Sequence, residues 1–201
     1  MKIVSLFAAF FLFAFVSCKQ ENEKPSDAAL VAEQESEQES APEGLDYDSN
    51  PLCTDVKDIA EALPKFDNYR GYRRYETVCL PNRAYGFNYR AKDDAPQKFT
   101  IIIYDTKSDY KPFYDHVVAG YKEAQESKAK NIMRTSKLPG DKGYVVAFND
   151  AETIGASYEC LIKDTYYLYV IINDDKSAAS PDGIEAFIGD YVSKINTSKL
   201  K

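Results

Sequence analysis

Residues 99–104 read FTIIIY and residues 166–172 read YYLYVII, and these two stretches decide the fold class. Both are rich in β-branched and aromatic residues, which favour strands. Neither alternates between apolar and polar residues, so each predicts a central strand that is covered on both faces. A sheet built around such strands needs helices packed against it, which predicts an α/β sandwich.

Other segments with strand character complete a predicted sheet of about six strands. The six segments are residues 72–80, 85–90, 98–104, 143–148, 154–162 and 166–172. Turn-forming residues lie between some of them, namely PGDKG at 139–143 and DT at 164–165. Because these connections are short, we expect the strands from Gly143 onward to pair as an antiparallel meander.

Three segments have apolar residues at helical spacing and are expected to cover the sheet. They are residues 55–63, 109–128 and 181–195. Thr54 and Ser180 are the expected N-caps of the first and third helices, and Pro181 occupies the first position of the third. Pro64 is expected to end the first helix.

The order helix, strands, helix, strands, helix resembles the PsbP and Mog1 type of α/β sandwich. The resemblance lies in element order over residues 51–201 and includes no shared motif. The predicted class is therefore α+β, with one antiparallel sheet of about six strands covered by about three helices. Since a fold does not determine a function, this resemblance implies no ligand.

The first eighteen residues have a different character. Lys2 precedes an apolar run from Ile3 to Val16, and the small residue Ser17 follows. This pattern is typical of a secretory signal peptide, and the run is shorter than the roughly 20 residues that cross a bilayer as a helix. A retained membrane helix is therefore less favoured than a cleaved signal peptide.

Residues 15–18, FVSC, resemble the lipobox of bacterial lipoproteins, with Phe15 in the position where leucine is usual. The resemblance implies that residues 1–17 are removed and that Cys18 becomes a lipidated, palmitate-bearing N-terminus. The protein would then be anchored in the bacterial cell envelope, with the outer membrane as the expected location and its periplasmic or cell-surface face left open. The alternative is a plain secretory signal whose cysteine is coincidental.

Residues 18–50 predict a lipidated cysteine followed by an acidic, disordered tether, and residues 51–201 predict a single globular domain. The tether has ten acidic residues against Lys19 and Lys24, whereas residues 51–201 have 22 acidic and 22 basic residues. The chain's net charge of −7 therefore comes from the tether. A neutral domain gives no reason to expect a nucleic-acid partner. The tether is either a solvated spacer or, by its composition, similar to the surface-export signals of some Gram-negative lipoproteins.

Three cysteines remain once Cys18 is assigned to lipid. Cys160 shares an alternating apolar pattern with Tyr158 and Ile162, so we expect it to face the core. Cys53 and Cys79 lie near the ends of predicted elements, and we favour a disulfide between them. Such a bridge would stabilise the fold by roughly 3 kcal/mol on the chain-entropy model.

The sequence contains no motif that is diagnostic of a particular reaction. The nucleophile-elbow, zinc-protease, dinucleotide and P-loop patterns are all missing, so we predict no catalytic residue, no metal site and no cofactor. His116 is the only histidine, and we interpret it as a helical residue at or near the surface. A catalytic role would require folding to bring Cys160 or a serine to it. The acidic pairs 93–94 and 174–175 are interpreted as solvated turns, with calcium binding a remote alternative.

Residues 70–90 contain five of the six arginines, and the stretch has a net charge of +4. The candidate binding surface comprises Arg70, Tyr72, Arg73, Arg74, Tyr75, Arg83, Tyr85 and Arg90. Arginine binds carboxylate or phosphate groups with two parallel hydrogen bonds, and tyrosine offers flat apolar area. The alternative is a structural sheet surface on which arginines stack against neighbouring tyrosines.

These patterns favour a non-catalytic accessory or binding module of the cell envelope. The expected partners are the membrane, through the lipid anchor, and either an envelope protein or an anionic polymer such as a glycan. A second hypothesis is a carrier of a small hydrophobic ligand, suggested by the aromatic-rich strands. An uncharacterised enzyme comes third.

Overall fold

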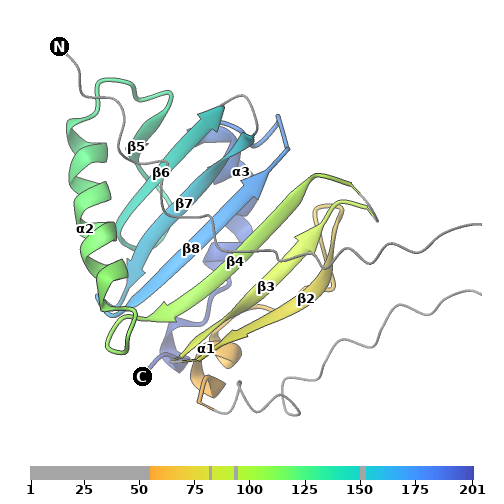
Figure 1. Ribbon diagram of the computed structural model, residues 1–201, viewed down its shortest axis with the longest axis vertical. Coiled ribbons are helices and arrows are strands. Elements are labelled where there is room, and N and C mark those ends of the chain that lie inside the picture. Colours follow the sequence, from red (N-terminus) through yellow and green to blue (C-terminus); the bar gives the residue numbers. More distant parts are fainter. Residues whose placement is uncertain (1–54, 82, 93–94, 150–152) are drawn as a thin grey trace, which may run out of the picture. The chain divides into compact units, whose positions relative to one another are not determined.

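An antiparallel sheet of eight strands, in the order β1-β2-β3-β4-β8-β7-β6-β5, organises the protein (Figure 1). The computed structural model describes residues 55–81, 83–92, 95–149 and 153–201. The strands are β1 (Asn68–Tyr69), β2 (Tyr72–Leu80), β3 (Ala84–Arg90), β4 (Lys98–Asp105), β5 (Met133–Thr135), β6 (Asp141–Asn149), β7 (Ile154–Ile162) and β8 (Tyr166–Asn173). The helices are α1 (Lys57–Ala62), α2 (Lys111–Glu126), α3 (Pro181–Ser193) and the 3-10 turn η3 (Thr197–Lys199).

The two apolar stretches form β4 and β8, which pair with each other at the centre of the sheet. Phe99 lies opposite Ile172 and Ile103 lies opposite Leu168, and all four side chains are fully buried. Strands β6, β7 and β8 pair in sequence as an antiparallel meander. The α+β class, the antiparallel sheet, the central pair and the meander are thereby confirmed.

The prediction of about six strands is wrong, because two short strands lie at the edges of the sheet. Strand β1 has two residues and joins β2 through Arg70 and Gly71, whose φ angles are +50° and +86°. Such positive angles fit a two-residue hairpin turn of the primed type. Strand β5 has three residues. Strands of this length show no alternation along the sequence, which explains why they were not predicted.

The three predicted helices are present with shorter bounds. Helix α3 begins as predicted, since the Ser180 hydroxyl accepts a hydrogen bond from the backbone nitrogen of Gly183 at 3.0 Å. Helix α1 ends before Pro64, but the residue at its N-cap is Val56. The proposed cap Thr54 lies outside the described residues. None of the described helices is long and apolar enough to span a membrane.

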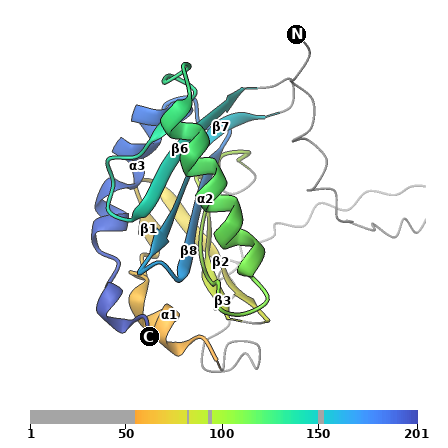
Figure 2. The same ribbon diagram turned by 90° about the vertical axis from the view of Figure 1, so that its left-hand side faces the viewer.

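The helices lie on opposite faces of the sheet (Figure 2). Helices α1 and α3 pack on what we call the inner face, over a large core that includes an aromatic cluster of Tyr69, Tyr89, Phe99, Phe187 and Tyr191. Helix α2 packs on the outer face, where it contacts β5, β6, β7 and β8. On β2–β4, α2 contacts the end of β4, where Phe113 packs on Tyr104 with ring centres 4.9 Å apart. The outer face therefore has two unlike halves.

Cys160 is a free thiol, fully buried on the inner face as predicted. Burial raises its pKa to about 12, so the thiol is unreactive at neutral pH. Cys79 also faces the inner core, at 9% exposure. Cys53 lies outside the described residues, and the Cys53–Cys79 disulfide stays a prediction.

Candidate functional site

A buried carboxylate lies on the outer face beneath α2. Glu159 is on β7 and is 7% exposed. Its Oε2 atom accepts hydrogen bonds from the hydroxyls of Tyr144 and Tyr167, each at 2.8 Å, and lies 2.9 Å from Nε2 of His116. We call Glu159, His116, Tyr144 and Tyr167 the glutamate cluster. It joins α2 to strands β6, β7 and β8.

The local sequence creates this cluster by leaving space under the helix. Tyr144 on β6 lies opposite Glu159 in the strand register, so both side chains point to the same face. A Cβ atom at Gly120 of α2 would lie only 2.4 Å from Cζ of Tyr144. Glycine at this helical position therefore lets the tyrosine ring reach under the helix and donate to the carboxylate.

The charges in the cluster support one another. Burial by itself raises the pKa of Glu159, but the hydrogen bond and the positive charge of His116 outweigh it and bring that pKa below its ordinary value. The hydrogen bond to Glu159 raises the pKa of His116. Burial and the carboxylate raise the pKa values of the Tyr144 and Tyr167 hydroxyls. Glu159 is therefore an ionised acceptor surrounded by donors.

The cluster has the composition of an acid–base pair, but no nucleophile accompanies it in the described residues. Cys160 points to the opposite face of the sheet. The Ser157 hydroxyl lies 3.4 Å from the other carboxylate oxygen of Glu159 and makes no hydrogen bond to His116. Nucleophilic catalysis of the serine or cysteine type needs a side-chain nucleophile within hydrogen-bond reach of the histidine. The contacts of the glutamate cluster satisfy a buried carboxylate and join α2 to the sheet.

The predicted arginine and tyrosine surface divides between ion pairs and the core. Arg70 pairs with Asp190 at 3.1 Å and Arg74 with Asp67 at 2.6 Å. Arg83 binds two carboxylates, those of Asp105 at 2.7 Å and Asp58 at 2.8 Å. Tyr72 and Tyr85 are buried in the inner core, at 4% and 1% exposure. These five residues have structural roles in the described part of the chain.

The remaining predicted residues, Arg73, Tyr75 and Arg90, lie on the outer side of β2–β4. Arg73 is the register partner of Arg90, and Arg90 is the register partner of Lys98, which was not predicted. We call Arg73, Arg90 and Lys98, on three adjacent strands, the cationic row. No ion pair joins any of them to an acidic residue within the described ranges. Tyr75 completes the group, because the Arg90 guanidinium lies 4.6 Å from the centre of its ring.

Arg90 has a feature that distinguishes it from the paired arginines. Its Nε atom is buried and has no hydrogen-bond partner among the residues that the structure describes. Buried polar atoms without partners are rare in folded proteins, and each one calls for an explanation.

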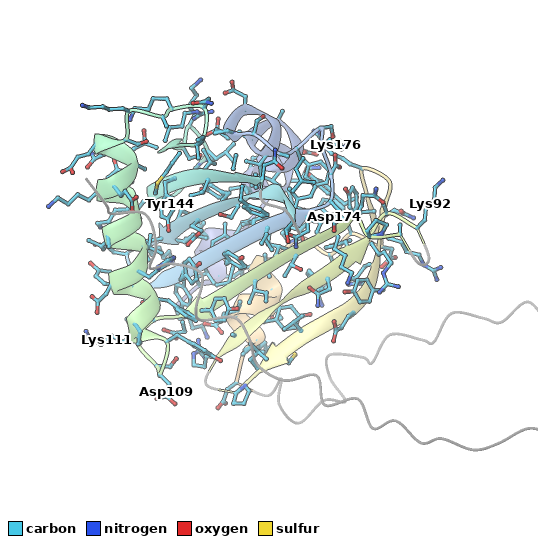
Figure 3. All side chains as sticks on the ribbon, turned by 45° about the horizontal axis from the view of Figure 1, so that its top comes forward. Lys92, Asp109, Lys111, Tyr144, Asp174 and Lys176 are labelled. Atoms are coloured by element: carbon cyan, nitrogen blue, oxygen red, sulfur yellow. The ribbon has the colours of Figure 1, made fainter. Side chains whose placement is uncertain are left out.

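A shallow cleft of about 520 Å³ lies at the same end of the sheet, next to the row. Residues of the β3–β4 and β8–α3 connections line it, among them Lys92, Asp174 and Lys176 (Figure 3). Figure 3 also shows Tyr144 beside α2, at the opposite edge of the sheet from Lys92. Asp175, a further lining residue, is occupied, since it accepts hydrogen bonds from the Tyr72 hydroxyl and from Ser177. Asp93 and Asp94 lie outside the described residues.

Sequence reasoning missed Lys98 and Glu159. Lys98 joins the row only through strand pairing, which composition cannot reveal. Glu159 did give a signal, because it is the one charged residue in the otherwise uncharged strand IGASYECLI at 154–162. Among the described residues no histidine, cysteine, aspartate and glutamate side chains are grouped so that they could hold a metal ion.

Comparison with known proteins does not extend this description: no family model, no curated protein and no solved structure matches the chain.

Proposed function

We propose that this protein is a lipid-anchored component of the bacterial cell envelope whose domain is a non-catalytic accessory module that binds an anionic partner. The partner is an anionic envelope polymer or an acidic surface of another envelope protein. The observation that carries the proposal is the cationic row, where Arg73, Arg90 and Lys98 lie side by side and pair with none of the acidic residues that the structure describes. Unpaired cations at adjacent register positions repel one another, and an anionic partner relieves that repulsion.

The sequence pattern at the N-terminus supports the location. Cys18 follows a signal-like segment, and 32 residues separate it from the domain at Pro51. A chain of that length spans at most about 110 Å, at roughly 3.3 to 3.6 Å per residue. The domain can therefore reach well beyond the surface of an outer membrane. The resemblance to the PsbP and Mog1 type of sandwich belongs to this proposal and assigns no ligand.

The carrier and enzyme hypotheses gain no comparable support from the described residues. The aromatic residues that suggested a carrier pack against each other in the inner core, for example Tyr89 on Phe99 with ring centres 5.1 Å apart. The histidine that suggested an enzyme binds a buried carboxylate. The binding function is therefore the one we advance.

In-cell cross-linking of the full-length protein, followed by mass spectrometry of what co-purifies, tests this function. The informative variant replaces Arg73, Arg90 and Lys98 by glutamine. The matched control replaces Lys107, Lys122 and Lys128, which are exposed cations outside the row, and so has the same net charge. We expect an envelope component that the wild type and the control capture and the row variant loses. Capture of the same component by all three proteins contradicts the proposal.

The anchor is tested separately with Cys18→Ala. If Cys18 carries the lipid, the variant is recovered in the soluble fraction and incorporates no labelled palmitate. A variant that stays in the membrane fraction contradicts lipid anchoring at this residue.

A further inference from the structure

The chemistry around the cationic row narrows the partner to one class of ligand. We infer that the ligand is an acidic polysaccharide; this inference rests on the proposed function. The polymer lies across β2, β3 and β4, with its charged groups on the cationic row and a sugar ring on Tyr75. A polymer of this class offers negative groups at regular intervals and flat, hydroxylated rings between them. Both properties have a counterpart on this face.

The spacing of the cationic row suits a ligand that carries negative charges at regular intervals. Arg73, Arg90 and Lys98 occupy matching register positions on three adjacent strands. Neighbouring strands are about 4.8 Å apart, so the row extends over roughly 10 Å, perpendicular to the strands. A single small anion neutralises at most one or two of these cations. A polymer that crosses the strands can bind all three.

Arg90 occupies the middle of the row and is prepared for an acceptor. Its guanidinium is held against the Tyr75 ring at 4.6 Å, and its buried Nε atom has no partner. No ion pair to a described acidic residue occupies this guanidinium, so its Nη groups can donate to a bound carboxylate. Hydrogen bonds between guanidinium and carboxylate are among the stronger ones in proteins.

Tyr75 is a large aromatic side chain that is exposed on this half of the outer face. The register between β2 and β3 shifts between Arg74 and Glu76, which marks a β-bulge at Tyr75. Bulges redirect side chains, and this one leaves Tyr75 47% exposed beside Arg90. An exposed ring that carries a polar tip is suited to contact with both the flat side and the hydroxyls of a sugar.

A ladder of polar side chains continues the surface next to the row. Asn88 donates to Glu76 at 2.6 Å, and the Thr100 hydroxyl donates to Asn88 at 2.7 Å. Amide and hydroxyl groups of this kind can exchange hydrogen bonds with sugar hydroxyls. Protein–protein interfaces, by contrast, depend on large side chains buried in well-packed pockets. The polar and cationic character of the part of this half that carries the row and the Glu76–Asn88–Thr100 ladder therefore favours a glycan over an acidic protein.

Equilibrium binding to three polymers tests the inference, with the full-length protein held in a neutral detergent. Polygalacturonate provides carboxylates on sugar rings, dextran provides sugar without charge, and polyphosphate provides charge without sugar. The protein variants are Arg90→Gln, Tyr75→Ser, the triple row variant and the Lys107, Lys122 and Lys128 control. Thermal unfolding of each variant confirms that it is folded.

We expect polygalacturonate to bind, dextran not to bind, and polyphosphate to bind more weakly. Arg90→Gln should weaken polygalacturonate binding roughly ten-fold, as expected for the loss of a charge-assisted hydrogen bond, and the triple row variant should abolish it. Tyr75→Ser should weaken polygalacturonate binding and leave polyphosphate binding unchanged. The control should bind as the wild type does.

Two results overturn the inference and separate it from the proposed function. Equal binding of polyphosphate and polygalacturonate, with no effect of Tyr75→Ser, overturns the assignment to a glycan. Equal loss of binding in the row variant and the lysine control overturns the assignment to this site. If the envelope component captured in cells still depends on the row in either case, the proposed function stands and only the ligand class is wrong.

Discussion

The two halves of the outer face differ in whether their charged groups have partners within the protein. Beneath α2 the carboxylate of Glu159 is buried and has three donors on one oxygen, from Tyr144, Tyr167 and His116. On β2–β4 no ion pair joins Arg73, Arg90 or Lys98 to an acidic residue that the structure describes. A polar group whose partners are all internal contributes to stability, whereas surface cations without an internal partner are free to bind an anionic ligand. The covered half should therefore control folding, and the other half should control binding.

The largest effect expected from this comparison is that of Glu159→Ala. Loss of the carboxylate leaves the buried hydroxyls of Tyr144 and Tyr167 without their acceptor, at a cost of about 1 to 3 kcal/mol for each. We expect the free energy of unfolding, measured by urea denaturation, to fall by about the sum of these two costs. The matched control is Glu76→Ala on the other half, where an exposed carboxylate should cost about 0.5 kcal/mol or less. Equal losses in the two variants would contradict the comparison.

Gly120→Ala tests the space under α2. The added Cβ would lie 2.4 Å from Cζ of Tyr144, so helix and strand must move apart, at a cost of about 1 to 3 kcal/mol. This cost should exceed the gain of up to about 1 kcal/mol that alanine brings to a helix.

Gly189→Ala on α3 is the control for this second prediction. A Cβ there meets only Cδ2 of Leu138, at 3.4 Å, so the substitution should stabilise the protein by about 0.5 to 1 kcal/mol. Thermal unfolding of the two variants should therefore shift in opposite directions. Stabilisation by Gly120→Ala would show that Tyr144 does not lie tightly under the helix.

His116→Gln gives a smaller effect that depends on pH. The pKa of His116 is raised in the folded state, so its contribution is complete below its ordinary value of about 6.5 and is lost as the pH rises through the folded value. The pKa of Glu159 is lowered, so its contribution is present above about 4.3 and is lost only as the pH falls through its folded value.

The difference in unfolding free energy between wild type and His116→Gln should therefore be largest between about pH 4.5 and 6.5. We expect it to reach about 1 kcal/mol at most, because the histidine side chain is 53% exposed and its charge is screened by water. Urea denaturation across the range from pH 4 to pH 9 measures it. A difference that increases with pH would show that the neutral histidine makes the stronger contact.

Arg90→Gln should change stability least. Its Nε makes no hydrogen bond to another described residue, so the main loss is the stacking on Tyr75, worth about 0.5 to 1 kcal/mol. Urea denaturation of Arg83→Gln gives the contrast, since that arginine holds the carboxylates of Asp58 and Asp105. A larger loss for Arg90→Gln than for Arg83→Gln would mean that the row serves folding.

The sequence was sufficient for the parts of the fold that depend on local patterns. Helix α3 follows from the cap at Ser180 and the apolar stripe, and β4 and β8 follow from two uninterrupted apolar runs. The edge strand β1 did not follow, because its two residues are fixed by a hairpin turn at Arg70 and Gly71. In such a turn the backbone angles, and not the alternation of side chains, define the strand.

The candidate site was predictable only in part, for a similar physical reason. The arginine-rich stretch directed attention to the region of Arg73 and Arg90, but composition could not show that Arg83 would be held by Asp58 and Asp105. Lys98 entered through its pairing with Arg90. Which charges pair and which remain unpaired depends on strand register and on residues distant in the sequence.

The most direct test of the division between the two halves is an NMR titration of the arginine Nε–H signals with polygalacturonate. The chain has six arginines, and four of them, Arg70, Arg74, Arg83 and Arg134, bind carboxylates within the protein. Our account predicts that the signals of Arg73 and Arg90 shift on binding and that the other four keep their positions. Shifts of similar size at all six signals, or shifts at the paired arginines alone, would contradict it.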